Sequence, residues 1–146
     1  MGELRSDLLV LGRLLLAAVL GGALGWERFR AGKWVGVRTL MVVAMASALF
    51  VCASLYEAPR VSGQLRGDPI WAIQAIAVGI GFMGAGIIHV DREGGVRGLT
   101  TAATAWATAA VGIAVALGHY LLAAGATALL LLIMRLVSFV EPKADD

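Results

Sequence analysis

Hydrophobic residues in this chain come in long uncharged runs that are separated by short charged stretches. The two clearest runs are 39–56 and 69–90, and neither contains an Asp, Glu, Lys or Arg. About 20 helical residues cross the roughly 30 Å hydrocarbon core of a membrane, so each run is long enough to cross it once. The pattern therefore predicts membrane-spanning helices over 38–56 and 69–90.

The run from Gly98 to Met134 also carries no charge, but it is too long for one crossing. As a single helix, rising about 1.5 Å per residue, it would be roughly 55 Å long. The sequence "LGHY", residues 117–120, offers a break, because Gly can end a helix and His and Tyr suit a membrane interface. We therefore expect two spans here, over 98–117 and 119–139.

The first apolar run covers residues 8–26 and is interrupted by Arg13 near its start. A long Arg side chain can extend to the nearer membrane surface, so the run still fits a span. The alternative is a cleaved signal peptide, but Glu3 and Asp7 do not suit the basic start of such a peptide. The whole chain, 1–146, is thus predicted to be one all-α transmembrane domain with five spans.

Charged residues between the spans predict how the chain is oriented. The segment 27–38 holds four basic residues and one acid, whereas the segment 57–68 is balanced. Basic loops are retained in the cytoplasm, so 27–38 should lie inside. An odd number of spans then places the N-terminus outside and the C-terminus inside.

Composition agrees with a membrane protein and limits its chemistry. The chain is 60% hydrophobic and 15% charged, with a mean hydropathy of +0.85, whereas soluble domains have about 25% charged residues. The net charge of +2 and the lack of a basic stripe argue against a nucleic-acid partner. Cys52 is the only cysteine, so neither an intramolecular disulfide nor a cysteine metal motif is possible. We expect membrane lipids as partners, no catalytic residue, no enzymatic activity and no cofactor.

Four glycines stand close together in the third predicted span. Residues 79–84, "GIGFMG", fit the letters of a dinucleotide-binding turn, but such a site needs a preceding strand and an acid about 20 residues later. No Asp or Glu occurs between Glu93 and Glu141, so the nucleotide interpretation fails. Small residues also let membrane helices approach closely. We interpret the helix as carrying a packing surface, because Ala77, Gly81 and Ala85 follow small-x-x-x-small spacing and Gly79 and Gly86 expose further backbone.

Gly21 and Gly25 form a similar small-residue face in the first span. The first and third spans are therefore expected to be neighbours, and the same faces suggest a homodimer. An alternative is a third helix that is broken near "GFMGAG", residues 81–86, with freed carbonyl groups along a transport pathway.

A group of polar residues is predicted to converge at the cytoplasmic edge of the membrane. It comprises Glu27, Arg28, Arg38, Thr39, Arg97, Thr100 and Thr101. We expect Glu27 to be held among the arginines, as a structural clamp or as a gated ligand site. Plain topology anchors are the alternative interpretation. One carboxylate among arginines suits Mg²⁺ poorly, so no metal ligand is assigned, whereas Arg97 at a helix start suits an anion.

Other polar residues lie deeper in the predicted spans or on the outer side. Thr104 and Thr108 continue a stripe from Thr100 and should face protein or water, and Gln74 should hydrogen-bond across helices. Asp68 precedes Pro69 on the outer side, which is typical of a helix N-cap. The residues assigned to packing or to a pathway are Gln74, Gly79, Gly81, Gly84, Gly86, Thr104 and Trp106.

An ordered set of motifs resembles the membrane domain of the MgtC/SapB family over about residues 10–140. The motifs are "GxxxGWER" (21–28), "GVRT" (36–39), "DP" (68–69), Gln74, "GIGFMGAG" (79–86), "VRGLTTAA" (96–103), Trp106 and "AAVG" (109–112). Two departures stand out. Val35 replaces an alanine that is common in the family, and the cytoplasmic C-terminal domain of many members is missing here, so no role of that domain is carried over.

The resemblance implies a multi-pass protein of the bacterial inner membrane that is linked to growth in low Mg²⁺ and, in pathogens, to survival inside macrophages. It implies no enzymatic activity. The partners it implies are the F-type ATP synthase and P-type Mg²⁺ transporters, and Mg²⁺ is the one ion it suggests. The expected function is therefore non-enzymatic regulation of membrane partners in Mg²⁺ homeostasis. The alternative is an ion transporter or channel with a pathway near the Gly-rich third helix.

Overall fold

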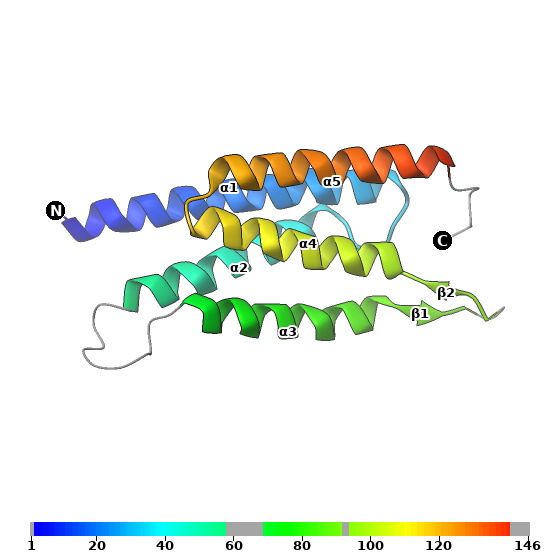
Figure 1. Cartoon of the computed structure of the whole chain (residues 1–146), viewed down its shortest axis with the longest axis horizontal. Coiled ribbons are helices and arrows are strands. Elements are labelled where there is room, and N and C mark those ends of the chain that lie inside the picture. The colour runs from blue at the N-terminus through cyan, green and yellow to red at the C-terminus, as the bar shows by residue number, and fades with distance from the viewer. Residues whose placement is uncertain (1, 58–68, 92–93, 141–146) are drawn as a thin grey trace.

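The computed structural model describes residues 2–57, 69–91 and 94–140 and is a helical bundle (Figure 1). The described elements, in chain order, are α1 (Gly2–Arg30), α2 (Val37–Glu57), α3 (Pro69–Ile87), β1 (His89–Val90), β2 (Val96–Arg97), α4 (Leu99–Ala116) and α5 (Tyr120–Val140). Each of the five described helices overlaps one predicted span, so the all-α class is confirmed. The two-residue strands form an antiparallel hairpin between α3 and α4, which the all-α prediction did not include.

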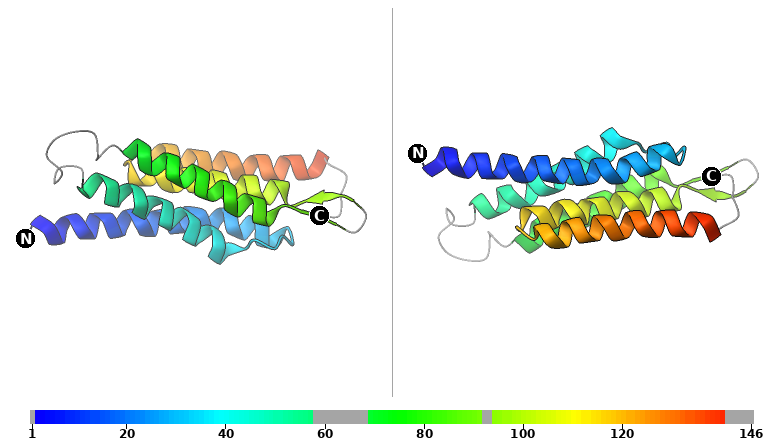
Figure 2. Two further views of the ribbon diagram at one scale, coloured as in Figure 1. Left: turned by 90° about the horizontal axis from the view of Figure 1, so that it is seen from below. Right: turned by 90° about the horizontal axis from the view of Figure 1, so that it is seen from above.

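Helix α4 is the central element of the bundle. It packs against α1, α2, α3 and α5, whereas α3 packs mainly on α4 and makes only a light contact with α2. Figure 2 shows the resulting arrangement. The pair α1 and α2 lies on one side of α4, and α3 and α5 each cover a different side of it. Accordingly, 56% of the α4 span is buried within the chain but only 17% of the α3 span. α3 is therefore an edge helix.

The outer surface of the bundle suits a lipid environment. Four helices are long and apolar enough to cross a membrane, and α5 adds a shorter apolar run over 120–136. Large apolar side chains such as Phe82 and Leu121 are almost fully exposed. Exposed aromatic residues lie toward both ends, with Trp26 and Trp34 at one end and Trp71 at the other, which is typical of the two membrane interfaces. The chain is therefore a multi-pass membrane protein.

The segment 31–36 between α1 and α2 and the β1–β2 hairpin lie at the same end of the bundle, which we call the basic end (Figure 1). The N-terminus of α1 and the turn between α4 and α5 lie at the opposite end. The C-terminal ends of α1 and α3 and the starts of α2 and α4 therefore lie at the same end of the bundle, as the predicted spans require. That the basic end faces the cytoplasm stays a prediction.

Helices α1 and α2 pack so closely that their contact requires glycine. A β-carbon at Gly21 would overlap the carbonyl oxygen of Leu40, and one at Gly25 would lie 2.6 Å from the α-carbon of Val37. The glycine face of α1 is thus covered by α2. The expectation that the first and third spans are neighbours is wrong, because the short segment 31–36 places α2 directly against that face.

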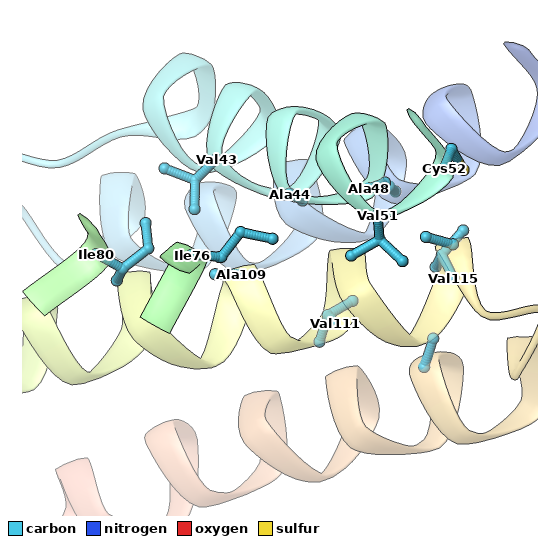
Figure 3. Packing of buried hydrophobic residues seen from close by; sticks show 13 residues of the cluster. Val43, Ala44, Ala48, Val51, Cys52, Ile76, Ile80, Ala109, Val111 and Val115 are labelled. Atoms are coloured by element: carbon cyan, nitrogen blue, oxygen red, sulfur yellow. The ribbon is translucent and has the colours of Figure 1, made fainter. Parts of the chain in front are cut away.

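The hydrophobic core lies between α2 and α4 and is built mostly from small side chains. Figure 3 shows α2, α3 and α4 residues meeting there, namely Val43, Ala44, Ala48, Val51, Cys52, Ile76, Ile80, Ala109, Val111 and Val115. Gly112 lies against the backbone of Ala44, where a β-carbon would overlap the Ala44 carbonyl oxygen. Small residues stabilise such a bundle by letting many atoms reach van der Waals contact.

Helix α3 differs from its prediction in two ways. It ends at Ile87 rather than at residue 90, because His89 and Val90 pair with β2. It is also continuous from Pro69 to Ile87, so the structure contradicts the alternative of a helix broken within 81–86. After the hairpin the chain packs against the end of α3 at Gly98. This position requires glycine, because its φ is +85° and a β-carbon would overlap the Ile87 carbonyl oxygen.

The turn between α4 and α5 matches the break that was predicted at residues 117–120. Gly118 has a φ of +83°, and the His119 amide donates to the Ala114 carbonyl oxygen over 2.9 Å, which closes the helix end. Arg13 of α1 extends to this turn. Its Nη1 donates to the Ala116 carbonyl oxygen over 2.9 Å and its Nε to the Tyr120 hydroxyl over 3.0 Å.

Candidate functional site

A cavity of about 240 Å³ opens at the basic end, between segment 31–36, the hairpin and the start of α4; we call it the basic-end cavity. Its lining residues are Lys33, Trp34, Val35, Ile87, His89, Arg97, Gly98, Thr100 and Thr101. The structure thus brings together three members of the predicted polar group, Arg97, Thr100 and Thr101. Sequence reasoning missed Lys33, Trp34 and His89, because only the hairpin brings these side chains to the start of α4.

The β1–β2 hairpin positions Arg97 and His89. Asp91 closes its turn by accepting a hydrogen bond from the Gly95 amide over 2.8 Å, and it also accepts one from Arg97 Nε over 2.8 Å. His89 is the direct cross-strand partner of Arg97. Directly opposed residues of an antiparallel pair project from the same face, so both side chains border the cavity.

Trp34 forms the side of the cavity toward α1 and α2. Its ring centroid lies 6.4 Å from that of His89, with the rings tilted by 60°. The His89 ring is also fixed by its Nδ1, which lies 3.1 Å from the Ile87 carbonyl oxygen. Trp34 is 95% exposed, which for a membrane protein fits a ring at the level of the lipid headgroups.

The first turn of α4 presents hydrogen-bond donors to the cavity. Gly98 is the N-cap and no side chain caps the helix, and the first amide to find a backbone acceptor is that of Ala102, which donates to Gly98 over 2.9 Å. Helix starts leave such amides without intrahelical partners. Within the described chain the Thr101 side chain, which is 5% exposed, forms no hydrogen bond. Every fully enclosed polar side-chain atom described there does have one. The Thr101 hydroxyl therefore opens into the cavity.

The predicted clamp around Glu27 is only partly present. Glu27 and Arg28 form a two-point ion pair, in which Arg28 Nη2 donates to Glu27 Oε1 over 2.9 Å, and both side chains are almost buried. Arg97 bonds Asp91 instead, because the hairpin holds it away from α1. Arg38 is exposed at the start of α2 and forms no ion pair within the described residues. The sequence predicted that three arginines hold Glu27, but only Arg28 does so among the described residues. Thr39 is exposed beside Arg38.

The threonine stripe of α4 faces protein beyond its first residue. Thr104 and Thr108 are buried, and each hydroxyl donates over 2.7 Å to the carbonyl oxygen four residues earlier. Thr104 also contacts the sulfur of Met134 in α5 at 3.6 Å. These hydroxyl groups are therefore satisfied inside the bundle, as their burial requires.

The packing or pathway residues of the third span lie mostly on the outside. A β-carbon added at Gly84 would lie 3.7 Å from the β-carbon of Ala102 in α4, whereas one added at Gly79, Gly81 or Gly86 would have no such neighbour within 4 Å. Gln74 is exposed and forms no hydrogen bond within the described chain, which contradicts the expected cross-helix bond.

The reason is that α3 turns its opposite face, with Ile76, Ile80 and Gly84, to the bundle. Trp106 is exposed on α4, at 55% of its surface. Asp68, the predicted outer N-cap, lies outside the described residues.

Fold and site together define a multi-pass α-helical membrane protein with a closely packed centre and a cavity at its basic end. The chain belongs to the MgtC family, whose model matches residues 14–143. The family identified from the motifs is thereby confirmed.

Similar proteins include the putative magnesium transporter YhiD of Escherichia coli K12, 40% identical over 84% of this chain and 58% of its own length. Protein MgtC of Salmonella typhimurium LT2 is 40% identical over 81% of this chain and 48% of its own length. Protein SrpB of Synechococcus elongatus is 41% identical over 73% and 62%. The chain thus spans about half the length of the curated relatives it matches. No solved structure matches it significantly.

Proposed function

We propose that this chain serves Mg²⁺ homeostasis in a bacterial inner membrane as a non-enzymatic regulator of other membrane proteins. Membership of the MgtC family and the name of the Escherichia coli relative support the link to magnesium. The aromatic residues near both ends and the apolar outer surface support a position within a membrane. The basic end faces the cytoplasm in this proposal, because basic segments are retained there.

The observation that best supports regulation is that α4 packs tightly on its neighbours. The backbone of Gly112 meets the backbone of Ala44, and the hydroxyls of Thr104 and Thr108 are bonded to carbonyl groups of their own helix. A hydrated ion pathway needs polar groups that face an opening. In the described bundle the Thr104 and Thr108 hydroxyls are bonded inside the protein and face no opening. This favours a protein that regulates other proteins over one that conducts ions.

Transport is the second candidate, and the name of the Escherichia coli relative favours it. A pathway along α3 was expected from its glycines, but this helix is continuous. Gly81 is exposed on the outside, and Gly79 borders a cavity of about 410 Å³ between α2 and α3 whose lining is mainly apolar. A transporter would therefore need a second conformation in which α3 unwinds or moves away from α4.

Helix α3 is also the surface that we propose for association with partners. Gln74, Gly81 and Ala85 are exposed on one side of the helix, and the Gln74 amide has no acceptor or donor within the described chain. In lipid such an amide gains about 1 kcal/mol from a partner on another helix. A second copy of the chain is the partner we propose first. The F-type ATP synthase and P-type Mg²⁺ transporters, which the family resemblance implies, are the regulated targets.

Two measurements on the same protein separate regulation from transport. In a bacterium without its own MgtC-family gene, the chain should restore growth in low Mg²⁺. In proteoliposomes loaded with a magnesium-sensitive dye, the same protein should pass no Mg²⁺ down an imposed gradient. Saturable Mg²⁺ flux, absent from liposomes without protein, would replace the regulator by the transporter. Failure to restore growth despite normal membrane insertion would remove the magnesium role itself.

A further inference from the structure

We propose that the basic-end cavity binds a phosphate group, either the phosphodiester of an anionic lipid headgroup or a soluble phosphate. This inference goes beyond the proposed magnesium role and does not depend on it. It stands on the charge of the lining, on the start of α4, on Thr101, and on the size and position of the cavity.

The charge of the lining favours an anion. Lys33 and Arg97 contribute two positive side chains from different parts of the chain, and His89 of β1 lies opposite Arg97. None of the lining residues is acidic. Asp91 holds Arg97 by its Nε atom but does not itself line the cavity. Cations that converge on a small opening at low dielectric attract a negatively charged group.

The start of α4 adds donors that are fixed in direction. This helix has 18 residues, so its aligned peptide dipoles place partial positive charge at the first turn. The amides of that turn have no side-chain cap, so they can donate to a ligand in the cavity. Phosphate oxygens are suitable acceptors for such amides because they carry full negative charge.

Thr101 is an independent sign of a ligand. Its side chain is 5% exposed, yet its hydroxyl forms no hydrogen bond within the described chain. Thr104 and Thr108 on the same helix bond the carbonyl group four residues earlier. The Thr101 oxygen is not fully enclosed and opens into the cavity, so the hydroxyl can bond an acceptor that enters there. Thr100 lines the cavity next to it.

The size and position of the cavity narrow the ligand further. Its volume of about 240 Å³ is below the roughly 300–1,000 Å³ of pockets for drug-sized molecules, which suits a headgroup or a single phosphate rather than a nucleotide. Trp34, 95% exposed at its edge, is the kind of residue found at headgroup depth. Basic pockets at the cytoplasmic side of helix bundles are typical sites for anionic lipid headgroups.

Binding is tested with the purified chain in phosphatidylcholine nanodiscs without Mg²⁺. One arm titrates inorganic phosphate at constant ionic strength, and the other raises the fraction of phosphatidylglycerol in the nanodisc. Both arms follow the tryptophan fluorescence of the protein, and Trp34→Phe identifies the part of the signal that comes from residue 34. We expect a saturable change in one arm, and that arm tells whether the phosphate belongs to a lipid or is free.

Three variants decide whether the cavity is the site. Thr101→Val keeps the side-chain shape and removes the hydroxyl, and Lys33→Gln removes one positive charge from the lining of the cavity. Each should raise the half-saturating concentration about tenfold, as expected for a lost hydrogen bond to a charged group. Arg30→Gln, a basic and exposed control at the end of α1 outside the cavity, should change it less than twofold.

Two results would overturn the proposal. One is no saturable change in either arm. The other is an equal loss of affinity in Arg30→Gln and in Lys33→Gln, which would indicate a diffuse attraction to the basic end. Since no magnesium is present and growth is not measured, neither result bears on the proposed role in Mg²⁺ homeostasis.

Discussion

Gly112 of α4 packs directly on the backbone of Ala44 in α2, so closely that a β-carbon at residue 112 would overlap the Ala44 carbonyl oxygen. A backbone carbonyl cannot move aside as the tip of a flexible side chain can. The close approach of α2 and α4 at this point therefore requires the absence of a side chain at residue 112.

We expect Gly112→Ala to destabilise the bundle by about 3 kcal/mol, because the two helices must separate to admit the methyl group. The matched control is Gly79→Ala on α3, where no atom lies within 4 Å of the added carbon. Helix propensity should make that change neutral or mildly stabilising. The stability of both variants is measured by thermal unfolding in detergent, with size-exclusion chromatography as the readout of protein that remains folded. Equal loss in the two variants would show that the glycines matter for another reason.

The contrast between these glycines shows what the sequence could predict and what it could not. The spans, the break at 117–120 and the family follow from run lengths, charges and ordered motifs, which are properties of the chain itself. Which face of a glycine-rich helix is buried depends on its neighbours. Gly21 and Gly79 have similar small-residue surroundings in the sequence, yet a β-carbon would overlap Leu40 at the first and have no neighbouring helix within 4 Å at the second.

Removing one member of the buried pair Glu27–Arg28 should destabilise the fold more than removing both members. Glu27→Gln leaves the Arg28 charge, at 5% exposure, without its counter-ion, and we expect a loss of about 3–5 kcal/mol. Replacing both residues, by Glu27→Gln with Arg28→Met, removes the stranded charge and should recover part of that loss. Thermal unfolding of the two variants provides the comparison. If the double variant were the less stable, the pair would not be acting through its charges.

Arg13 is expected to hold the turn between α4 and α5 through its two hydrogen bonds. Tyr120→Phe removes one of them and should cost about 1 kcal/mol, whereas Arg13→Gln also exposes the Ala116 carbonyl group and should cost more. A double-mutant cycle on the two residues should give a coupling energy near 1 kcal/mol. A coupling energy of zero would mean that the Arg13–Tyr120 bond contributes nothing in the membrane.

The candidate site could be predicted only in part, for a physical reason that concerns the hairpin. Arg97, Thr100 and Thr101 are close in sequence and were grouped correctly. Glu27 was placed with Arg97 because both lie at the same membrane edge, but the β1–β2 hairpin gives Arg97 a nearer acid in Asp91. Residue spacing does not reveal such a two-residue ladder, so His89 and Trp34 were missed as well.

The outer face of α3 should decide whether the chain self-associates. Gln74 has no hydrogen-bond partner within the described chain and Gly81 has open space around it, so a second helix can approach there and satisfy the amide. Gln74→Leu should weaken a dimer about threefold to tenfold, from roughly 1 kcal/mol of lost bonding, and Gly81→Leu should weaken it further by blocking close approach. Leu121→Ala, on the exposed side of α5, is the control and should leave association unchanged.

The fraction of dimers in liposomes, counted by single-molecule photobleaching over a range of protein-to-lipid ratios, measures these shifts. All variants should retain the unfolding temperature of the parent chain, since the substituted residues are exposed. Parent protein that stays monomeric at every ratio would remove self-association from the proposed function. The Gln74 amide would then have to find its partner on a different membrane protein.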